Sequence, residues 1–513
     1  MGSEQKRIVK NSIGRCMFVV ISLFVQVGWF VLWILELNQY SAEISLLCSL
    51  LALVVVLGIY GRHMNAAFKI PWMILIMVFP VLGLCLYFLI GHSRANRRMR
   101  KYFEKIEQTS KGLLVQDKNI IAQLEKEDFS VANQARYLAE YGKYPVYQNT
   151  DAVFYDDASK GLEAQKEALW QAKDFIFMEY HAIEDSKAFA GLREILRKKA
   201  AEGVEVRIIY DDIGSVGFIN TGFIRQMEKE GIKCRVFNPM LPIVNVFMNN
   251  RDHRKIMVID GKIGFTGGYN LADEYFNLTH PYGWWKDTGI RLQGDAVRSF
   301  TVMFLEMWNA IRQSDKSYDR YLKKSVYRGN EQGYIQPYAD SPLDNENVGE
   351  NVYMNLLKHA KHKIYFTTPY LIISDEMSRE LCLAAKRGVD VRIITPGIPD
   401  KKLVFKVTRS YYAPLVAAGV KIFEYTPGFI HAKQCVCDGE LAAIGTINMD
   451  YRSLYFHFEN GVLLYKTDAI QAIQRDFEET FLQSEEVTKK YRYQNSTVLR
   501  IGQCLLRLLA PLL

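Results

Sequence analysis

The sequence predicts an α/β fold in which two similar domains, each a mixed sheet flanked by helices, follow an N-terminal region of transmembrane helices. From about Ser130, strand-like apolar runs alternate with amphipathic helices, which is the pattern of a sheet covered by helices. This pattern occurs twice in the same order, and three long apolar stretches precede it. At 513 residues the chain also exceeds what one hydrophobic core usually fills.

The internal repeat is visible as three pairs of matching segments. Each half has a strand pattern, an amphipathic helix, a run of the type Gly-Val-acid-Val-Arg-Ile-Ile, and a further strand that begins with Gly. We expect the first domain at 130–335 and the second at 336–490, with a shared site at their interface. The matching segments are 175–180 with 364–370, 203–209 with 388–394, and 231–237 with 419–425.

Residues 1–100 predict a membrane anchor with two to three transmembrane helices. Each apolar stretch approaches the ~20 residues that a helix needs to cross a bilayer. Basic residues precede the first stretch and follow the third, so three full crossings cannot place both flanks in the cytoplasm. Pro71 and Pro80 make the third stretch the candidate for a kinked or interfacial segment. We favour a multi-pass protein of the cell membrane with a cytoplasmic catalytic region. The stretches are 17–35, 44–60 and 70–90.

Two further apolar segments have two interpretations each. Residues 497–513 predict an amphipathic C-terminal helix, with Val498 and Leu505 among its regularly spaced apolar residues. This helix would either lie on a membrane surface or pack on the protein's own core. The segment 240–248 interrupts the first domain, either as a small core segment or as a lip that contacts acyl chains.

Charge and cysteine usage limit the classes of function. The chain has 64 Lys and Arg against 56 Asp and Glu, and the resulting charge of +8 suits membrane surfaces or nucleic acid equally. The eight cysteines are scattered, with no Cys-x2-Cys pair and no ordered Cys/His spacing. Neither a zinc site nor a disulfide scaffold is predicted, and we expect no cofactor.

Two copies of a His-x-Lys-x4-Asp motif carry the chemistry. Each copy is followed, after the same six-residue gap, by small residues and an asparagine. Chance would supply on the order of a few hundredths of one such match in this chain, so two copies with equal tails are a strong signal. The first copy is His253, Lys255, Asp260 and Asn270, and the second is His431, Lys433, Asp438 and Asn448.

Strand geometry explains this spacing. A histidine and a lysine two residues apart point to the same face of a strand, where a phosphate can meet both side chains. The Asp-Gly pair after each motif strand predicts a tight hairpin, and the returning strand brings the asparagine back beside the His-Lys pair.

Phosphodiester exchange needs a nucleophile, cations that hold the phosphate oxygens, and an acid for the leaving alkoxide. We expect one imidazole to attack phosphorus while the other protonates the alcohol and then activates the incoming hydroxyl. Lys255 and Lys433 would neutralise the phosphate oxygens and the two asparagines would add neutral donors, so no metal ion is required. Asp260 and Asp438 would orient a histidine, hold the local fold, or serve only the turn.

Both motifs with their Gly-x-x-Asn tails resemble the phospholipase D superfamily, and the resemblance to its bacterial cardiolipin synthases covers nearly the whole chain. It implies that phosphatidylglycerol forms a phosphatidyl-histidine with loss of glycerol, and that a second phosphatidylglycerol captures it to give cardiolipin. It further implies that His253 is the nucleophile and His431 the acid and base. The chain departs from the family in its extra apolar stretch at 17–35 and in a Gly-Gly tail where Gly-Ser is usual. The supporting segments are 80–84, 91–92, 210–215, 285–288, 367–370, 448–453 and 508–513.

The alternative is a membrane-bound phospholipase D-type hydrolase or nuclease, because the same motifs serve phosphatidyl transfer, phospholipid hydrolysis and nucleic-acid hydrolysis. The apolar segments favour a lipid, and nothing near the motifs resembles a nucleic-acid module. We therefore expect phosphatidylglycerol, cardiolipin and the membrane as partners, no nucleic acid, and an oligomeric state that the sequence leaves open. A non-catalytic scaffold would be expected to lose a motif histidine or lysine, whereas all four are present.

Overall fold

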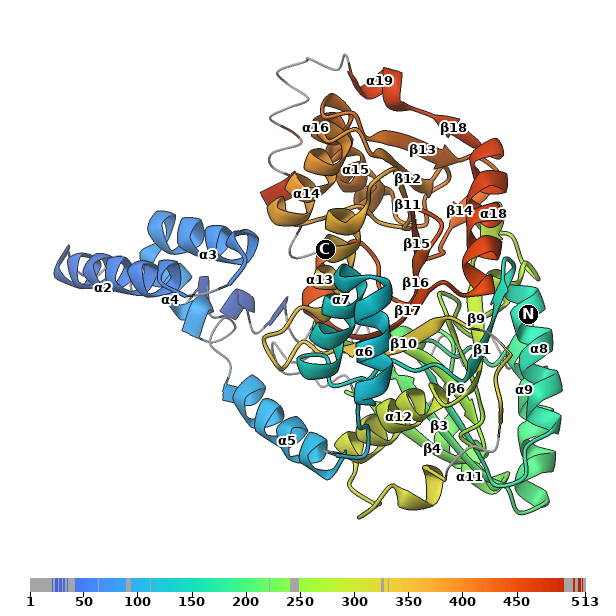
Figure 1. The fold of residues 1–513 in the computed structure, drawn as a ribbon. Coiled ribbons are helices and arrows are strands. Elements are labelled where there is room, and N and C mark those ends of the chain that lie inside the picture. The colour runs from blue at the N-terminus through green and yellow to red at the C-terminus, as the bar shows by residue number, and fades with distance from the viewer. Residues whose placement is uncertain are drawn as a thin grey trace.

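A computed structural model gives the mixed α/β architecture of the chain (Figure 1). It describes residues 42–62, 64–88, 94–110, 112–220, 222–239, 249–323, 327–330 and 332–492, with single positions within 21–35 and 502–510. The predicted segment 240–248 and most of the stretch 17–35 lie outside the described residues.

The first half of the chain forms a seven-stranded sheet with the order β1-β9-β7-β6-β2-β3-β4. Its members β2, β3 and β4 run parallel to one another, and the remaining neighbours pair antiparallel. The strands are β1 (Thr150–Tyr155), β2 (Phe175–Tyr180), β3 (Glu205–Asp211), β4 (Lys233–Phe237), β6 (Lys255–Ile259), β7 (Ile263–Gly267) and β9 (Gly289–Gly294).

The second half repeats this order as β10-β17-β16-β15-β11-β12-β13, with β18 added at the edge. The predicted duplication and the mixed sheets are therefore confirmed. The strands are β10 (Tyr334–Asp340), β11 (Lys363–Thr367), β12 (Asp390–Pro396), β13 (Lys421–Tyr425), β15 (Gln434–Cys437), β16 (Leu441–Gly445), β17 (His457–Tyr465) and β18 (Ser484–Glu486).

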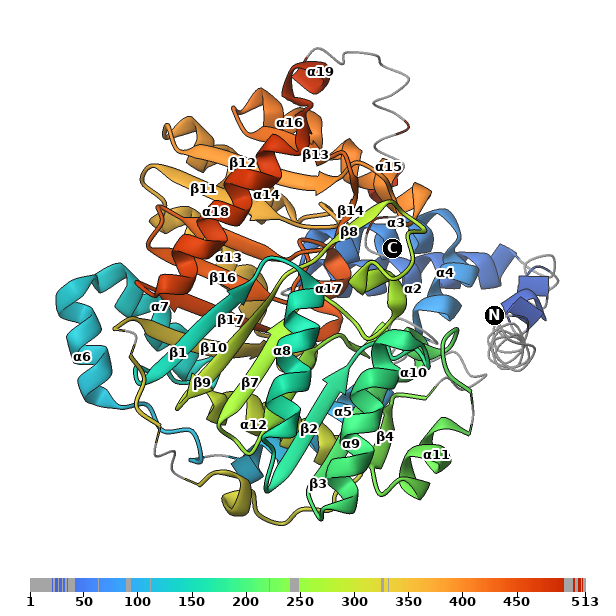
Figure 2. The same cartoon turned by 90° about the vertical axis from the view of Figure 1, so that its right-hand side faces the viewer.

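Helices cover both faces of the sheets, and in Figure 2 α8 and α9 lie in front of the first sheet with α12 behind it. Aspartate and serine caps start several helices; Asp157 accepts from the Ser159 N–H before α8, and Ser374 from the Met377 N–H before α14. The helices of the two halves are α6 (Lys118–Glu127), α7 (Phe129–Glu140), α8 (Ala158–Trp170), α9 (Lys187–Ala201), α10 (Asp212–Ser215), α11 (Phe223–Lys229), η3 (Asp273–Phe276), α12 (Val297–Ile311), η4 (Asp319–Tyr321), α13 (Val348–His359), α14 (Asp375–Lys386), α15 (Lys402–Ser410), α16 (Tyr412–Ala417), α17 (Tyr451–Tyr455), α18 (Asp468–Leu482) and α19 (Thr488–Arg492).

The N-terminal helices α2 (Ala42–Tyr60), α3 (Ala66–Val78) and α4 (Pro80–Leu86) stand out from this body, and α5 (Arg94–Ser110) leads back to it (Figure 1). The third predicted apolar stretch is not one helix: α3 ends at Val78, and Pro80 begins α4. At Gly83 the two helices approach closely, since a Cβ there would lie 2.6 Å from Ile76 Cα. Within the part of the chain that the structure describes, no helix combines the length and apolarity needed to cross a membrane.

The N-terminal unit is joined to the second half through α17. The Phe68 ring packs edge-on against Tyr451, Tyr455 and Phe456, with ring centroids 5.2–5.5 Å apart. At the other end of the chain Ala510 is buried, and Leu506 packs against the main core. For these described residues, the packing interpretation of the C-terminal segment holds.

Candidate active site

Two short parallel ladders join the halves of the chain at the motif histidines. In one, β5 (Arg251–Asp252) pairs with β17, so that Arg251 faces His457. In the other, β14 (Gly428–Ile430) pairs with β8 (Trp284–Lys286), so that Phe429 faces Trp285. The motif histidines directly follow β5 and β14. Each donates its backbone N–H to the other half, His253 to Phe458 O and His431 to Lys286 O. The two histidines therefore occupy equivalent positions.

Each histidine is oriented by a carboxylate from the other half. Nδ1 of His253 lies 2.9 Å and 3.0 Å from the two carboxylate oxygens of Glu459, and Nδ1 of His431 lies 2.7 Å from Asp287 Oδ2. All four side chains are buried. An Nδ1–H that donates to a carboxylate leaves Nε2 with the lone pair. Neither carboxylate was predicted as a site residue, although Asp287 lies in the segment 285–288 that supports the family resemblance.

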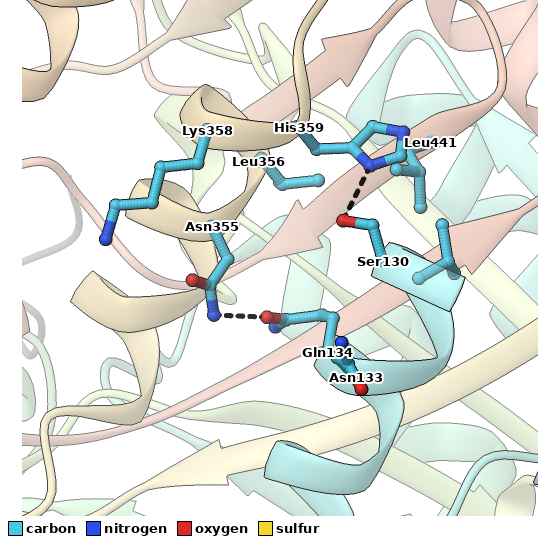
Figure 3. Close-up of a pocket in the computed structure, with 9 residues that line it drawn as sticks. Ser130, Asn133, Gln134, Asn355, Leu356, Lys358, His359 and Leu441 are labelled. Atoms are coloured by element: carbon cyan, nitrogen blue, oxygen red, sulfur yellow. Dashed lines mark hydrogen bonds between the residues drawn. The ribbon is translucent and has the colours of Figure 1, made fainter. Parts of the chain in front are cut away.

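Both histidines open onto one cavity of about 590 Å³ between the halves. Asn270 and Asn448 also line it, so the structure brings together the histidines and asparagines of both motifs. A separate pocket of about 300 Å³ between α7 and α13 contains no motif residue; there His359 Nδ1 lies 3.2 Å from Ser130 Oγ (Figure 3). The cavity is also lined by His181, Ile213, Phe218, Arg251, Glu274, Tyr275, Tyr282, Trp285, Tyr370, Ile372, Asp400, Lys401, Val404, Asp450, Tyr451, Arg452, His457 and Ala510.

The two motif lysines are buried directly behind the histidines. Lys255 Nζ donates to the backbone oxygen of His253 at 2.7 Å, and Lys433 Nζ donates to that of His431. Burial lowers the pKa of Lys255 to about 8 and that of Lys433 to about 7. An anion in the cavity would favour the charged form of both lysines.

Burial and the nearby lysines also lower the pKa of both histidines. The pKa of His253 falls well below its usual value, and that of His431 falls to about 3 although Asp287 opposes the shift. The pKa of Asp287 is itself held below its usual value by His431 and Lys433, against the effect of its burial. The free site therefore holds neutral imidazoles beside an ionised carboxylate at neutral pH.

The two asparagines differ in their contacts. Asn270 Oδ1 accepts from the Ala182 N–H at 3.1 Å, and its Nδ2 donates to the Tyr275 hydroxyl at 2.9 Å. Asn448 Oδ1 is buried and makes no hydrogen bond to the described residues. Asn448 therefore retains an unsatisfied polar atom at the cavity.

Asp260 and Asp438, which were expected among the catalytic residues, do not line this cavity. Each lies in the hairpin turn at the far end of its motif strand, with a φ of 52°. The carboxylate of Asp260 accepts from the backbone N–H groups of 173, 174 and 175 at the start of β2. Asp438 does the same for 361, 362 and 363 before and at the start of β11. They hold the local fold and the turn, and they contact neither histidine.

Small residues after each motif allow the returning strand to approach the carboxylates. A Cβ on Gly268 would lie 2.1 Å from Asp287 Oδ1, so only glycine fits there. The equivalent residue in the second half, Thr446, instead donates its hydroxyl to Glu459. In the first half, the Thr288 N–H donates to Asp287 at 2.9 Å. Glu459 therefore accepts from a side-chain hydroxyl of the second tail, whereas Asp287, beside the Gly-Gly tail, accepts from the Thr288 backbone N–H.

One group of described residues has the donor atoms of a metal site. Ligand atoms of His253, His457 and Glu459 lie within 4.8 Å of one another. In the free site, however, Glu459 already holds the Nδ1 proton of His253.

Two histidines that converge from two similar domains on one cavity, each with a lysine buried behind it, define a phosphodiester-transfer enzyme of the phospholipase D type. The family model for the cardiolipin synthase phospholipase D-like domain matches residues 166–308 and 353–481, and the phospholipase D-nuclease N-terminal model matches 48–92. The chain belongs to the cardiolipin synthase family.

Individual relatives agree with this assignment. The chain is 31% identical to a cardiolipin synthase of Halalkalibacterium halodurans, over 98% of this chain and 100% of the relative. It is 34% identical to a cardiolipin synthase of Geobacillus kaustophilus, over 93% and 94%. The crystal structure of phosphatidylserine synthase from Haemophilus influenzae Rd KW20 has a TM-score of 0.55 at 14% identity, over 74% of this chain and 99% of that one, and shows the fold.

Proposed function

We propose that the protein is a cardiolipin synthase that transfers the phosphatidyl group of one phosphatidylglycerol to another, releasing glycerol. The observation that carries this proposal is that each half supplies the carboxylate that orients the motif histidine of the other half. It gives two equivalent, oriented imidazoles on one cavity, with two lysines behind them. Such a pair suits a two-step exchange at one phosphorus atom.

In the first step, Nε2 of one histidine forms a bond to phosphorus while the bond from phosphorus to the glycerol oxygen breaks. The second histidine, as imidazolium, gives its proton to that oxygen. In the second step the now neutral histidine takes a proton from a hydroxyl of the second phosphatidylglycerol, whose oxygen displaces the nucleophile. The resemblance assigns the attack to His253 and the proton transfers to His431.

The lysines and asparagines support both steps. The phosphodiester brings a negative charge that raises the low pKa of the flanking imidazole and so favours its protonated form. Lys255 and Lys433 neutralise that charge in a buried site, where their effect is strongest. Asn448, with its unsatisfied oxygen at the cavity, is a candidate contact for the lipid head group, together with Asn270.

The lipid substrate and the N-terminal region support a membrane location. Large apolar side chains on α2, including Leu46, Leu50, Val54 and Leu57, are more than half exposed. A contiguous apolar surface of this kind is typical of lipid or protein contact. We propose that the region anchors a multi-pass protein in the cell membrane with the catalytic halves on the cytoplasmic side, and that its partners are phosphatidylglycerol and cardiolipin.

The test supplies the full-length protein with phosphatidylglycerol in mixed micelles and resolves the products by mass spectrometry. Cardiolipin and glycerol in equal amounts are expected. Phosphatidic acid with glycerol would instead make the protein a hydrolase. A double variant that lacks both motif histidines controls for contaminating activity.

A further inference from the structure

The surroundings of the two motif histidines differ although their backbones are equivalent. In the two ladders between the halves, Arg251 pairs with His457 where Phe429 pairs with Trp285. His457 packs beside the ring of His253 with centroids 5.4 Å apart, and Trp285 packs beside His431 at 5.3 Å. One half of the site therefore has an additional imidazole where the other has an indole.

This additional imidazole has no hydrogen-bond partner among the described residues. Both ring nitrogens of His457 are buried without one. Nδ1 of His457 lies 3.6 Å from Glu459 Oε1, which is beyond a normal hydrogen bond. A buried donor or acceptor without a partner lowers the stability of the protein. A ligand that binds the His457 nitrogen would remove this cost.

The distances from Glu459 to the two histidines are close to those around a transition-metal ion, and all three ligand atoms lie within 4.8 Å of one another. Glu459 Oε1 lies 2.9 Å from His253 Nδ1 and 3.6 Å from His457 Nδ1. Around a tetrahedral zinc ion with bonds near 2.0–2.1 Å, ligand atoms lie about 3.3 Å apart. Two imidazoles and one carboxylate are a common zinc donor set, and an exogenous molecule can take the fourth position from the cavity.

We propose that His253, His457 and Glu459 form an inhibitory binding site for one divalent transition-metal ion of the zinc type. Binding moves the proton of the neutral His253 imidazole from Nδ1 to Nε2, and metal bonds to Nδ1 and to Glu459 replace the hydrogen bond between these two side chains. Nε2 of His253 then carries a proton in place of the lone pair that attacks phosphorus, so turnover stops.

The other half supplies a built-in comparison. Around His431 the equivalent residues are Asp287 and Trp285, and indole offers no lone pair to a metal. The described residues therefore hold one such cluster and not two. The proposal predicts one bound ion per chain.

The first experiment measures binding without reference to activity. Full-length protein without a histidine tag is treated with EDTA, dialysed, and titrated with Co²⁺, whose visible absorption reports tetrahedral coordination. One Co²⁺ per chain, displaced by Zn²⁺, is expected. His457→Asn should weaken binding by at least about tenfold, because one of three protein ligands is lost.

A gain-of-site variant makes the test stricter. Trp285→His supplies the missing imidazole beside His431 and Asp287 and should raise the stoichiometry from one to two, whereas Trp285→Phe should leave it at one. Binding that survives His457→Asn, or no saturable Co²⁺ signal in the unmodified protein, would overturn the proposal.

The second experiment connects binding with turnover. Zn²⁺ should inhibit phosphatidyl transfer by the unmodified protein, with reversal by EDTA, and should inhibit His457→Asn far less when each rate is compared with its own metal-free value. Equal inhibition of both proteins would place the inhibitory ion elsewhere and refute the assignment.

Discussion

His253 in the first half of the chain is held by Glu459 in the second, with Nδ1 2.9 Å and 3.0 Å from its carboxylate oxygens. His431 and Asp287 make the reciprocal contact at 2.7 Å. Each imidazole therefore depends on the opposite half for its orientation and tautomer.

Substitution of Glu459 or Asp287 should lower kcat and leave substrate binding nearly unchanged. Glu459→Gln and Asp287→Asn keep the shape of the side chain but remove the charge that supports an imidazolium, so kcat should fall by about 10²- to 10⁴-fold. KM for phosphatidylglycerol should change little. Glu485→Gln, at an exposed position, is the matched control. A change confined to KM would show that the carboxylates act on binding instead.

Loss of either motif histidine should abolish turnover. His253→Ala and His431→Ala each remove one of two groups that act together, and a fall of at least about 10³-fold is expected in both. Circular dichroism checks that each variant is folded. Substantial activity in one single variant would contradict a shared site.

Asp260 and Asp438 should affect stability and not chemistry. Asp260→Ala leaves three backbone N–H groups without their acceptor and should lower the free energy of unfolding by about 1–3 kcal/mol. Asp260→Asn keeps one acceptor oxygen and tolerates the positive φ, so its effect should be smaller. Urea unfolding measures both. A large loss of rate per folded molecule would return Asp260 to the catalytic set.

Binding of an anion should weaken as pH rises. The pKa of Lys433 is about 7 and that of Lys255 about 8, so between pH 7 and 9 the free site loses positive charge and must take up protons to hold a phosphate. The affinity for inorganic phosphate should fall by up to about tenfold per pH unit for each lysine involved. Calorimetry at several pH values measures this. Lys433→Arg, which stays charged, should flatten the profile, and an unchanged profile would exclude Lys433 as its source.

A chelator should not lower the rate. The charge on the phosphate is balanced by buried lysines, so EDTA should leave the turnover of metal-free protein unchanged and should relieve inhibition where zinc was bound. Strong inhibition by EDTA that Mg²⁺ or Ca²⁺ reverses would disprove this electrostatic scheme.

Local sequence patterns predicted much of this structure because the features they report are local. The Asp-Gly hairpins after each motif depend on residues that accept positive φ, and both occur with φ of 52° at the aspartate. The duplication was readable because matching runs such as 203–209 and 388–394 form equivalent parallel strands, β3 and β12.

Local sequence patterns could not predict that each histidine is oriented by a carboxylate from the other half. Glu459 lies 206 positions after His253, and nothing near either residue indicates that β17 pairs with β5. The break at Pro80 was anticipated as a kink, but the close return of α4 onto α3 depends on Gly83, which has no distinct signal in the sequence. For the aspartates, the pattern left three roles open, namely orienting a histidine, holding the local fold or serving only the turn, and the backbone contacts of Asp260 and Asp438 lie 75 to 87 positions away in the chain, outside any local pattern.

The two short ladders between the halves also limit how such a site could arise. An isolated half would carry a motif histidine together with a carboxylate aimed away from it, so it could not orient its own imidazole. Two separate copies related by a two-fold axis would each complete the other. Fusion of those copies into one chain would keep both contacts at a fixed stoichiometry. It would also allow the two halves to change in sequence independently. His457 and Trp285, which differ at equivalent positions, are such a change.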